Sequence, residues 1–172
     1  SNSPAVQTWN IQNMDSLIVE DNLLFEETVR LTDVCEYGFS WEKFATGKTP
    51  LPPEGVRFDI HFEGVVTGDD LQGIIRGVDY LTVRSDGRLF LELHAAITTH
   101  DGVMIKVTET GINDNGNLQL NMDFHTSDNR YAWLNQKHVW GLGTVNFTTG
   151  EVYIKGYQNK REKTNFGVFG KS

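Results

Sequence analysis

The sequence predicts an all-β protein, namely a single antiparallel β-barrel of roughly eight strands with a central cavity. Runs rich in Ile, Val, Leu, Thr, Tyr and Phe recur at even spacing through residues 23–158, and such side chains suit a pleated, half-buried surface. Tight-turn signals such as Ser85-Asp86-Gly87 and Asn115-Gly116 separate these runs, and no long helical pattern interrupts them. A barrel is favoured over a sandwich because closure removes exposed strand edges.

The expected strands follow from alternation of apolar and polar residues. In the first, Phe25, Glu27, Val29 and Leu31 share one face under a period of two, and Glu27 is the charged member. The third is expected to bend near Gly77, and the seventh to break between Asn135 and Lys137. The eight strands are expected at residues 23–32, 56–63, 71–84, 88–99, 103–111, 117–125, 131–147 and 151–158.

Residues 34–53 form an aromatic connection that ends in prolines. Ser40 is expected to cap a single helical turn through Lys43 or Phe44, and the prolines forbid regular structure after it. A connection this long inside a compact domain is usually functional. Two readings stay open: a lid or pocket rim, or a plug that closes one end of the barrel.

The length of 172 residues fits one domain, with residues 1–22 as an N-terminal arm or short first strand and residues 159–172 as a tail. Anchors in the arm are expected at Trp9, Ile11, Met14 and Leu17. The tail begins with a solvated charge run over residues 159–163, and Phe166 and Phe169 are expected to dock on the body.

The net charge of −8 disfavours nucleic acid and anionic membrane surfaces as partners, because both require a basic protein surface. No apolar run approaches the roughly 20 residues of a membrane span. Cys35 is the single cysteine and is expected to be a buried small hydrophobic residue rather than a nucleophile. The compartment stays open between cytoplasmic and secreted, because a leader could have been removed before Ser1.

Glu92 and His94 are the leading catalytic candidates. Their strand face also carries Phe90 and Ala96, and this mixed composition suits a cavity wall. A carboxylate beside an imidazole positions the imidazole for proton transfer. Asp79, after the Gly77 bend, is expected to join the pair from the neighbouring strand.

The same acid-x-His spacing occurs on two further strands, as Asp59/His61 and Asp123/His125, and these pairs are expected to face water. Three histidines on three strands could converge on Zn²⁺ or Fe²⁺, but the spacing of a known metal motif is absent, so no metal and no cofactor is expected. The candidate ligand-binding residues are Arg57, His61, Tyr80, Phe90, Tyr131, Trp133 and Trp41.

A series of glycine steps and turns carries a family resemblance over residues 23–158. It includes Gly55-x-Arg57, Leu71-x-Gly73, Gly77-x-Asp79 and, further on, Gly141-x-Gly143. In this order and spacing they resemble the family called domain of unknown function 3237. The resemblance implies a single-domain antiparallel β-barrel of lipocalin-like or allene-oxide-cyclase-like appearance with a central cavity. Relatives commonly carry arginine at the position of His94, which fits a pocket retuned for another ligand.

Three functions remain open. The first is a cofactor-independent enzyme performing acid/base chemistry, as an isomerase, cyclase, dehydratase or lyase, on a small apolar or aromatic compound. The second is a non-catalytic carrier barrel, and the third is a structural module. The expected partner is a small molecule, and a homo-oligomer is possible because some of the four tryptophans could lie at an interface.

Overall fold

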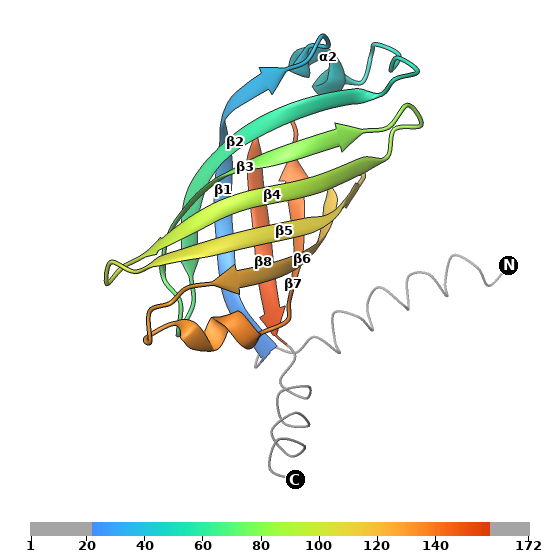
Figure 1. Cartoon of the computed structure of the whole chain (residues 1–172). Coiled ribbons are helices and arrows are strands. Elements are labelled where there is room, and N and C mark those ends of the chain that lie inside the picture. The colour runs from blue at the N-terminus through green and yellow to red at the C-terminus, as the bar shows by residue number, and fades with distance from the viewer. Residues whose placement is uncertain (1–21, 159–172) are drawn as a thin grey trace, which may run out of the picture.

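The computed structural model describes residues 22–158, which form a closed antiparallel barrel of eight strands in sequential order (Figure 1). The predicted fold class is therefore confirmed. The expectations for Trp9, Ile11, Met14, Leu17, Phe166 and Phe169 lie outside the described residues. The strands are β1 (Leu23–Glu36), β2 (Val56–Thr67), β3 (Gly73–Val83), β4 (Leu89–Thr99), β5 (Met104–Asp114), β6 (Asn117–His125), β7 (Val139–Asn146) and β8 (Glu151–Gln158).

Strict alternation along the strands builds the core. In β6 every second residue is buried and the residues between are exposed. In β1, Phe25, Glu27 and Val29 turn inward together, as the period of two predicts. The largest fully buried apolar side chains come from six strands, from the segment before β3 and from the connection between β6 and β7: Phe25, Phe58, Leu71, Ile75, Ile97, Ile105, Met122 and Leu134.

One end of the barrel is covered by the short helix α2 (Trp41–Thr46) (Figure 1). Ser40 caps it by accepting a hydrogen bond from the Lys43 backbone N–H at 3.0 Å, as the sequence predicts. Gly47 ends it in the left-handed conformation, with φ at 68°. The helix itself has no buried residue, so it is held through its aromatic side chains.

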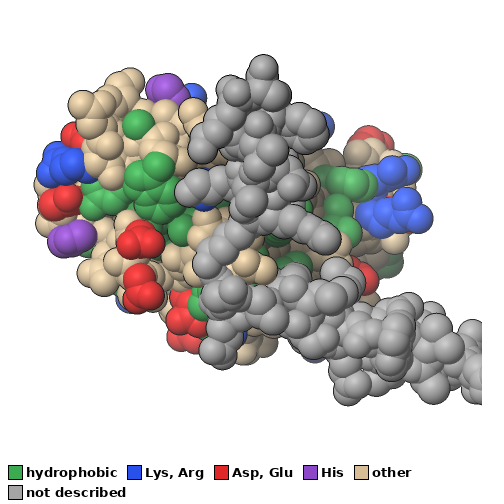
Figure 2. Space-filling model, turned by 90° about the horizontal axis from the view of Figure 1, so that it is seen from below, with side chains coloured by type: hydrophobic (Ala, Val, Ile, Leu, Met, Phe, Trp, Pro, Cys, Tyr) green, Lys and Arg blue, Asp and Glu red, His purple; other side chains and the backbone are tan. Residues whose placement is uncertain are grey.

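The opposite end is covered by a 3-10 helix, η2 (Ala132–Gln136). The prediction of a strand beginning at residue 131 is wrong for this segment, because residues 132–136 form a 3-10 helix that buries Leu134, with Tyr131 buried just before it. Asn135 fastens the helix to β6, since its side chain exchanges two hydrogen bonds with the backbone of Thr126. Seen from this end, hydrophobic side chains form a band with charged side chains around it (Figure 2).

Two further sequence expectations have clear outcomes. The Asn115-Gly116 turn is confirmed, because both residues have positive φ, 53° and 88°, as a tight hairpin requires. The expectation that Cys35 is buried is wrong: it lies exposed near the end of β1, where β1 passes the rim of the barrel. No helix within residues 22–158 is long and apolar enough to cross a membrane.

Candidate functional site

Three acidic side chains point into the apolar interior of the barrel. Glu27 on β1, Asp79 on β3 and Glu109 on β5 are 1%, 7% and 2% exposed. Each takes a position where its strand neighbours on the same face are apolar. Four of their carboxyl oxygens are buried without a hydrogen-bond partner, namely one of Glu27, one of Asp79 and both of Glu109. Unpartnered buried carboxyls are rare, because desolvation is costly.

Burial sets the protonation of these groups. It raises the pKa of Glu27 from 4.5 to about 7 and that of Asp79 from 3.8 to about 7. The pKa of Glu109 lies well above its usual range, first because of burial and then because of the negative charges of Glu27 and Asp79. The interior therefore holds exchangeable protons near neutral pH, where ordinary carboxyls have lost them.

Asp79 differs from the two glutamates in its backbone surroundings. β3 and β4 pair at Asp79 with Leu93 and again at Thr82 with Phe90. Between these pairs the Glu92 backbone N–H donates to the Asp79 carboxylate and lowers its pKa, in opposition to burial. Of the three carboxyls, Asp79 therefore has a local donor that favours its ionised form.

A cavity of about 60 Å³ lies beside Glu27 and Asp79. Its other walls are almost wholly apolar, and Asn113 is the remaining polar side chain on them. Asn113 is already engaged, because its side-chain oxygen accepts from the Gly116 backbone N–H at 2.8 Å. The lining thus combines apolar walls with two titratable groups, which is the usual composition of a ligand site.

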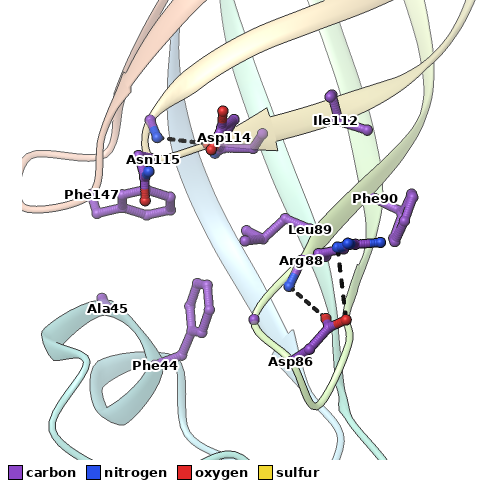
Figure 3. Close-up of a pocket in the computed structure, with 13 residues that line it drawn as sticks. Phe44, Ala45, Asp86, Arg88, Leu89, Phe90, Ile112, Asp114, Asn115 and Phe147 are labelled. Atoms are coloured by element: carbon purple, nitrogen blue, oxygen red, sulfur yellow. Dashed lines mark hydrogen bonds and ion pairs between the residues drawn. The ribbon is translucent and has the colours of Figure 1, made fainter. Parts of the chain in front are cut away.

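A larger hollow of about 640 Å³ opens at the α2 end, between the helix and the hairpin turns (Figure 3). Its rim carries Asp86 and Arg88, whose side chains lie 3.7 Å apart. Leu89, Asn113 and Phe147 line both this hollow and the interior cavity. We call the larger hollow the mouth, because those shared residues stand between it and the carboxyls.

Four aromatic rings pack together at this boundary. The Trp41 ring lies 5.3 Å from that of Phe44 and 5.1 Å from that of Phe58, and Phe147 lies 6.4 Å from Trp41 and 6.0 Å from Phe44. Trp41 and Phe147 also line the cavity. Of these rings, Trp41 and Phe44 come from residues 34–53, and they lie at the α2 end of the barrel, where Trp41 lines the cavity and Phe44 lines the mouth.

Glu92 and His94 lie on the outer wall of β4, which corrects the expectation that they face the interior. Their side chains are 65% and 49% exposed, and His94 Nε2 lies 3.7 Å from Glu92 Oε1. The leucines at 89, 91 and 93 take the inward face because they fill the apolar core. Asp79 is therefore separated from this pair by the barrel wall, and the expected three-residue site does not form.

The candidate ligand-binding residues divide into three places. Trp41 lines the cavity. Tyr131 and Trp133 lie at the η2 end, where the Tyr131 hydroxyl donates to Asp101 Oδ1 at 2.7 Å and Trp133 donates to the Arg130 backbone carbonyl. Phe90 faces outward and also reaches the edge of the mouth. The remaining three lie on the outer face of β2 or β3: Arg57, His61 and Tyr80.

The histidines of the three acid-x-His pairs stand exposed on the outer faces of alternate strands, β2, β4 and β6. The expectation that Asp59/His61 and Asp123/His125 turn away from the core is confirmed. In the described part of the chain, no three His, Cys, Asp or Glu side chains are placed to hold a metal ion.

Sequence reasoning missed Glu27 and Glu109 as site residues. The signal was available for Glu27, which interrupts an otherwise apolar face between Phe25 and Val29. Glu109 gave the same signal between Val107 and Gly111. An acid on the apolar face of a strand indicates either a mistaken strand or a buried carboxyl, and here the second holds.

Comparison with known proteins agrees with the fold. The family model described as Protein of unknown function (DUF3237) matches residues 42–117, which confirms the family resemblance. A crystal structure of a β-barrel like protein from Acinetobacter baumannii is similar at TM-score 0.66 and 23% identity, over 80% of this chain and 93% of that one. A protein of unknown function from Rhodopseudomonas palustris is similar at TM-score 0.63 and 23% identity, over 80% and 95%.

Two of the similar proteins are named as enzymes. The hydroalkoxylation enzyme phnH of Penicillium herquei is 33% identical over 89 residues, which cover 49% of this chain and 57% of that protein. The chain thus spans little more than half the length of this relative. A crystal structure of an enzyme from Penicillium herquei is similar at TM-score 0.55 and 25% identity, over 78% of this chain and 93% of that one. The chain is a β-barrel related to a fungal enzyme.

Proposed function

We propose that this protein is an enzyme that acts on a small molecule carrying a hydroxyl group and a carbon–carbon double bond. The interior carboxyls serve as acid and base to add the hydroxyl O–H across the double bond, or to reverse that addition. The observation that carries the proposal is the set of three buried carboxyls with unpartnered oxygens in an apolar barrel. The reaction requires proton transfer and positioning, so it needs no redox centre.

Burying these carboxyls lowers the stability of the folded protein, and packing of the core does not require them. A polar group buried without a hydrogen bond costs roughly 1–3 kcal/mol in proteins, and three such groups share one interior. Leucine or methionine at these positions would fill the same space without that cost. Strongly shifted carboxyls in a cavity are typical of sites that move protons.

The relative's name supplies the reaction class, since hydroalkoxylation is the addition of an alcohol O–H across a double bond. In the acid-catalysed form, a carboxylic acid O–H breaks and its proton forms a C–H bond at one alkene carbon. The substrate hydroxyl oxygen then bonds to the other carbon, and its proton passes to a carboxylate. One carboxyl gives a proton and the other takes one, and transfer of that proton from the acceptor back to the donor restores the starting state, so protons and electrons balance within substrate and protein.

The environments of the two cavity carboxyls suggest their roles. We assign Glu27 as the proton donor, because burial raises its pKa to about 7 and so keeps its proton close to neutral pH. We assign Asp79 as the acceptor, because the Glu92 backbone N–H favours its ionised form. Glu109 is a positioning residue: burial and the negative charges of Glu27 and Asp79 raise its own pKa well above its usual range, so it holds its proton more firmly than an ordinary glutamate does.

Labelling with deuterium tests this proposal. The full chain is incubated in D₂O with a set of compounds that each carry one hydroxyl and one double bond. Addition by the proposed route leaves one non-exchangeable C–D bond, which mass spectrometry and NMR detect. Glu27→Gln and Asp79→Asn should lower the rate by about 10²-fold or more, as loss of a general acid or base does.

Glu92→Gln is the matched control, because it removes a carboxylate from the outer wall and leaves the interior unchanged. Retention of activity in both interior variants would refute the catalytic assignment. Binding of compounds that are never converted would instead support the carrier barrel. Circular dichroism of each variant separates a lost fold from a lost acid.

A further inference from the structure

We propose that the interior cavity binds a compact organic cation, such as a quaternary or protonated amine, and that such a cation imitates the positively charged transition state of the addition. The second half rests on the proposed function, while the first half concerns binding alone. The cavity lies between Glu27, Asp79 and the ring of Trp41. These two carboxyls and the ring attract positive charge, and no buried basic side chain among residues 22–158 provides it.

The barrel interior holds acidic side chains and no basic side chain in the described part of the chain. Among residues 22–158 the buried polar and charged side chains are Glu27, Asp79, Thr99, Glu109, Asn113 and Thr126, and none of them is basic. The arginines and lysine on the neighbouring strands, such as Arg76 on β3 and Lys106 on β5, are exposed on the outer face. The interior carboxyls can therefore be compensated by a proton or by a bound cation.

Aromatic rings form part of the wall of the same cavity. Trp41, Phe62 and Phe147 line the cavity together with the two carboxyls. The face of an aromatic ring attracts a cation, most strongly for tryptophan and when water is excluded. Trp41 is fixed in place by its edge-on contact with Phe58, at 88° between the rings. Acids and rings thus favour the same kind of ligand from different walls.

The size of the cavity limits the ligand. About 60 Å³ corresponds to roughly four to six water-sized groups, if each needs about 10–15 Å³. A nitrogen with its attached methyl or methylene groups has that scale. A larger molecule would leave its remainder in the mouth, past Leu89 and Phe147.

Cation binding should be linked to proton release. The titratable groups that face one another across the interior are Glu27, Asp79 and Glu109. Their partners on the neighbouring strands are uncharged: Val66 and Ile154 beside Glu27, Ile60 and Leu93 beside Asp79, and Leu93 and Met122 beside Glu109, with Val139 of β7 next to Met122. A bound cation favours an ionised carboxylate, so binding near neutral pH expels a proton that the empty cavity holds.

The test compares two ligands of equal shape. Choline carries a trimethylammonium group, and its neutral carbon isostere carries a tert-butyl group in the same place. We expect calorimetric titration of the full chain to give choline at least about tenfold higher affinity at about pH 8.5, which lies above the pKa of about 7 of both Glu27 and Asp79. At about pH 5.5 the preference should shrink to about threefold or less. Titration near pH 7 in two buffers should reveal proton release with choline and none with the isostere.

Single substitutions test whether the preference for choline arises from the interior carboxyls. Glu27→Gln and Asp79→Asn should each reduce the choline preference several-fold, whereas Glu92→Gln on the outer wall should leave it unchanged. Equal affinity for the two ligands at about pH 8.5, no binding of choline, or a preference that survives in both interior variants would overturn the inference. The pH and proton-release results need no variant, so misfolding of a variant leaves the test intact.

The result also separates this inference from the proposed function. If choline shows no preference but Asp79→Asn abolishes C–D formation, the addition chemistry stands and the cation site is refuted. If choline binds with proton release but no compound gains deuterium, the cation site stands and the enzyme assignment fails.

Discussion

The Trp41 ring stands edge-on to the Phe58 ring, with centroids 5.1 Å apart and planes at 88°. This contact joins α2 to the interior of β2, and Phe44 adds a second ring 5.5 Å from Phe58. Because the helix has no fully buried residue, these rings provide its main attachment to the barrel. They also lie where the mouth narrows to the cavity, so one cluster holds the helix and covers the carboxyls.

Trp41→Ala should destabilise the protein by about 2 kcal/mol, because it removes a large, partly buried ring and its edge contacts. Urea unfolding followed by circular dichroism measures the loss. Trp140→Ala is the control, since Trp140 lies exposed on the outer face of β7 and should cost about 0.5 kcal/mol or less. Equal losses for the two variants would contradict the attachment by the aromatic cluster.

Stability should fall as pH rises from about 5 to about 8.5. Burial raises the pKa of Glu27 to about 7, so the folded chain holds that proton more firmly than the unfolded chain does. The resulting stabilisation is complete below pH 4.5, the ordinary value, and is lost as pH passes through about 7. For this residue alone the loss amounts to about 3 kcal/mol. Asp79 acts in the same direction.

Urea midpoints across this range measure the effect, and Glu27→Gln should flatten the curve because glutamine does not titrate. Glu92→Gln should leave the slope as it is. A protein whose stability increased steadily from pH 5 to about 8.5 would disagree with buried protonated carboxyls.

Glu92→Gln and His94→Ala should each change stability by about 0.5 kcal/mol or less, because exposed ion pairs contribute little. Turnover of any substrate found by deuterium labelling should likewise be kept in both variants. Thermal unfolding and rate measurements check the two statements. A strong loss of turnover in His94→Ala, with the fold intact, would return the catalytic centre to the outer wall.

Gly111→Ala should be strongly destabilising, by about 2–4 kcal/mol. A Cβ built on Gly111 would lie 2.0 Å from the Gln119 backbone oxygen, so β5 and β6 would have to separate. Thr110→Ala, the neighbouring exposed position, is the control and should be nearly neutral. Denaturant midpoints of the two variants test the close approach of the strands directly.

The fold could be predicted because its signals are local. β6 and β8 begin and end at the predicted residues, since turn residues and alternation fix both ends. The segment after Tyr131 could not be predicted as η2, because it is held by two hydrogen bonds between the Asn135 side chain and the Thr126 backbone, nine residues earlier. Single side-chain contacts of this kind leave no period in the sequence.

The candidate site was harder to predict than the fold, because its composition depends on which face of each strand turns inward. In β4 the face of Glu92 and His94 also carries Phe90 and Ala96, so it resembled a cavity wall. The opposite face carries the leucines, and it turns inward because burying leucine side chains is more favourable. Asp79 alone among the expected catalytic residues faces inward. That Glu27 and Glu109 meet it there follows from barrel closure, which brings β1, β3 and β5 around one axis.

β1 and β8 close the barrel side by side, and Leu23 of the first pairs with Tyr157 of the last at the end far from α2 (Figure 1). Attachment to a solid support through that end would therefore orient every molecule with its mouth toward the bulk liquid. Ligand screening on an immobilised array would then sample the entrance uniformly.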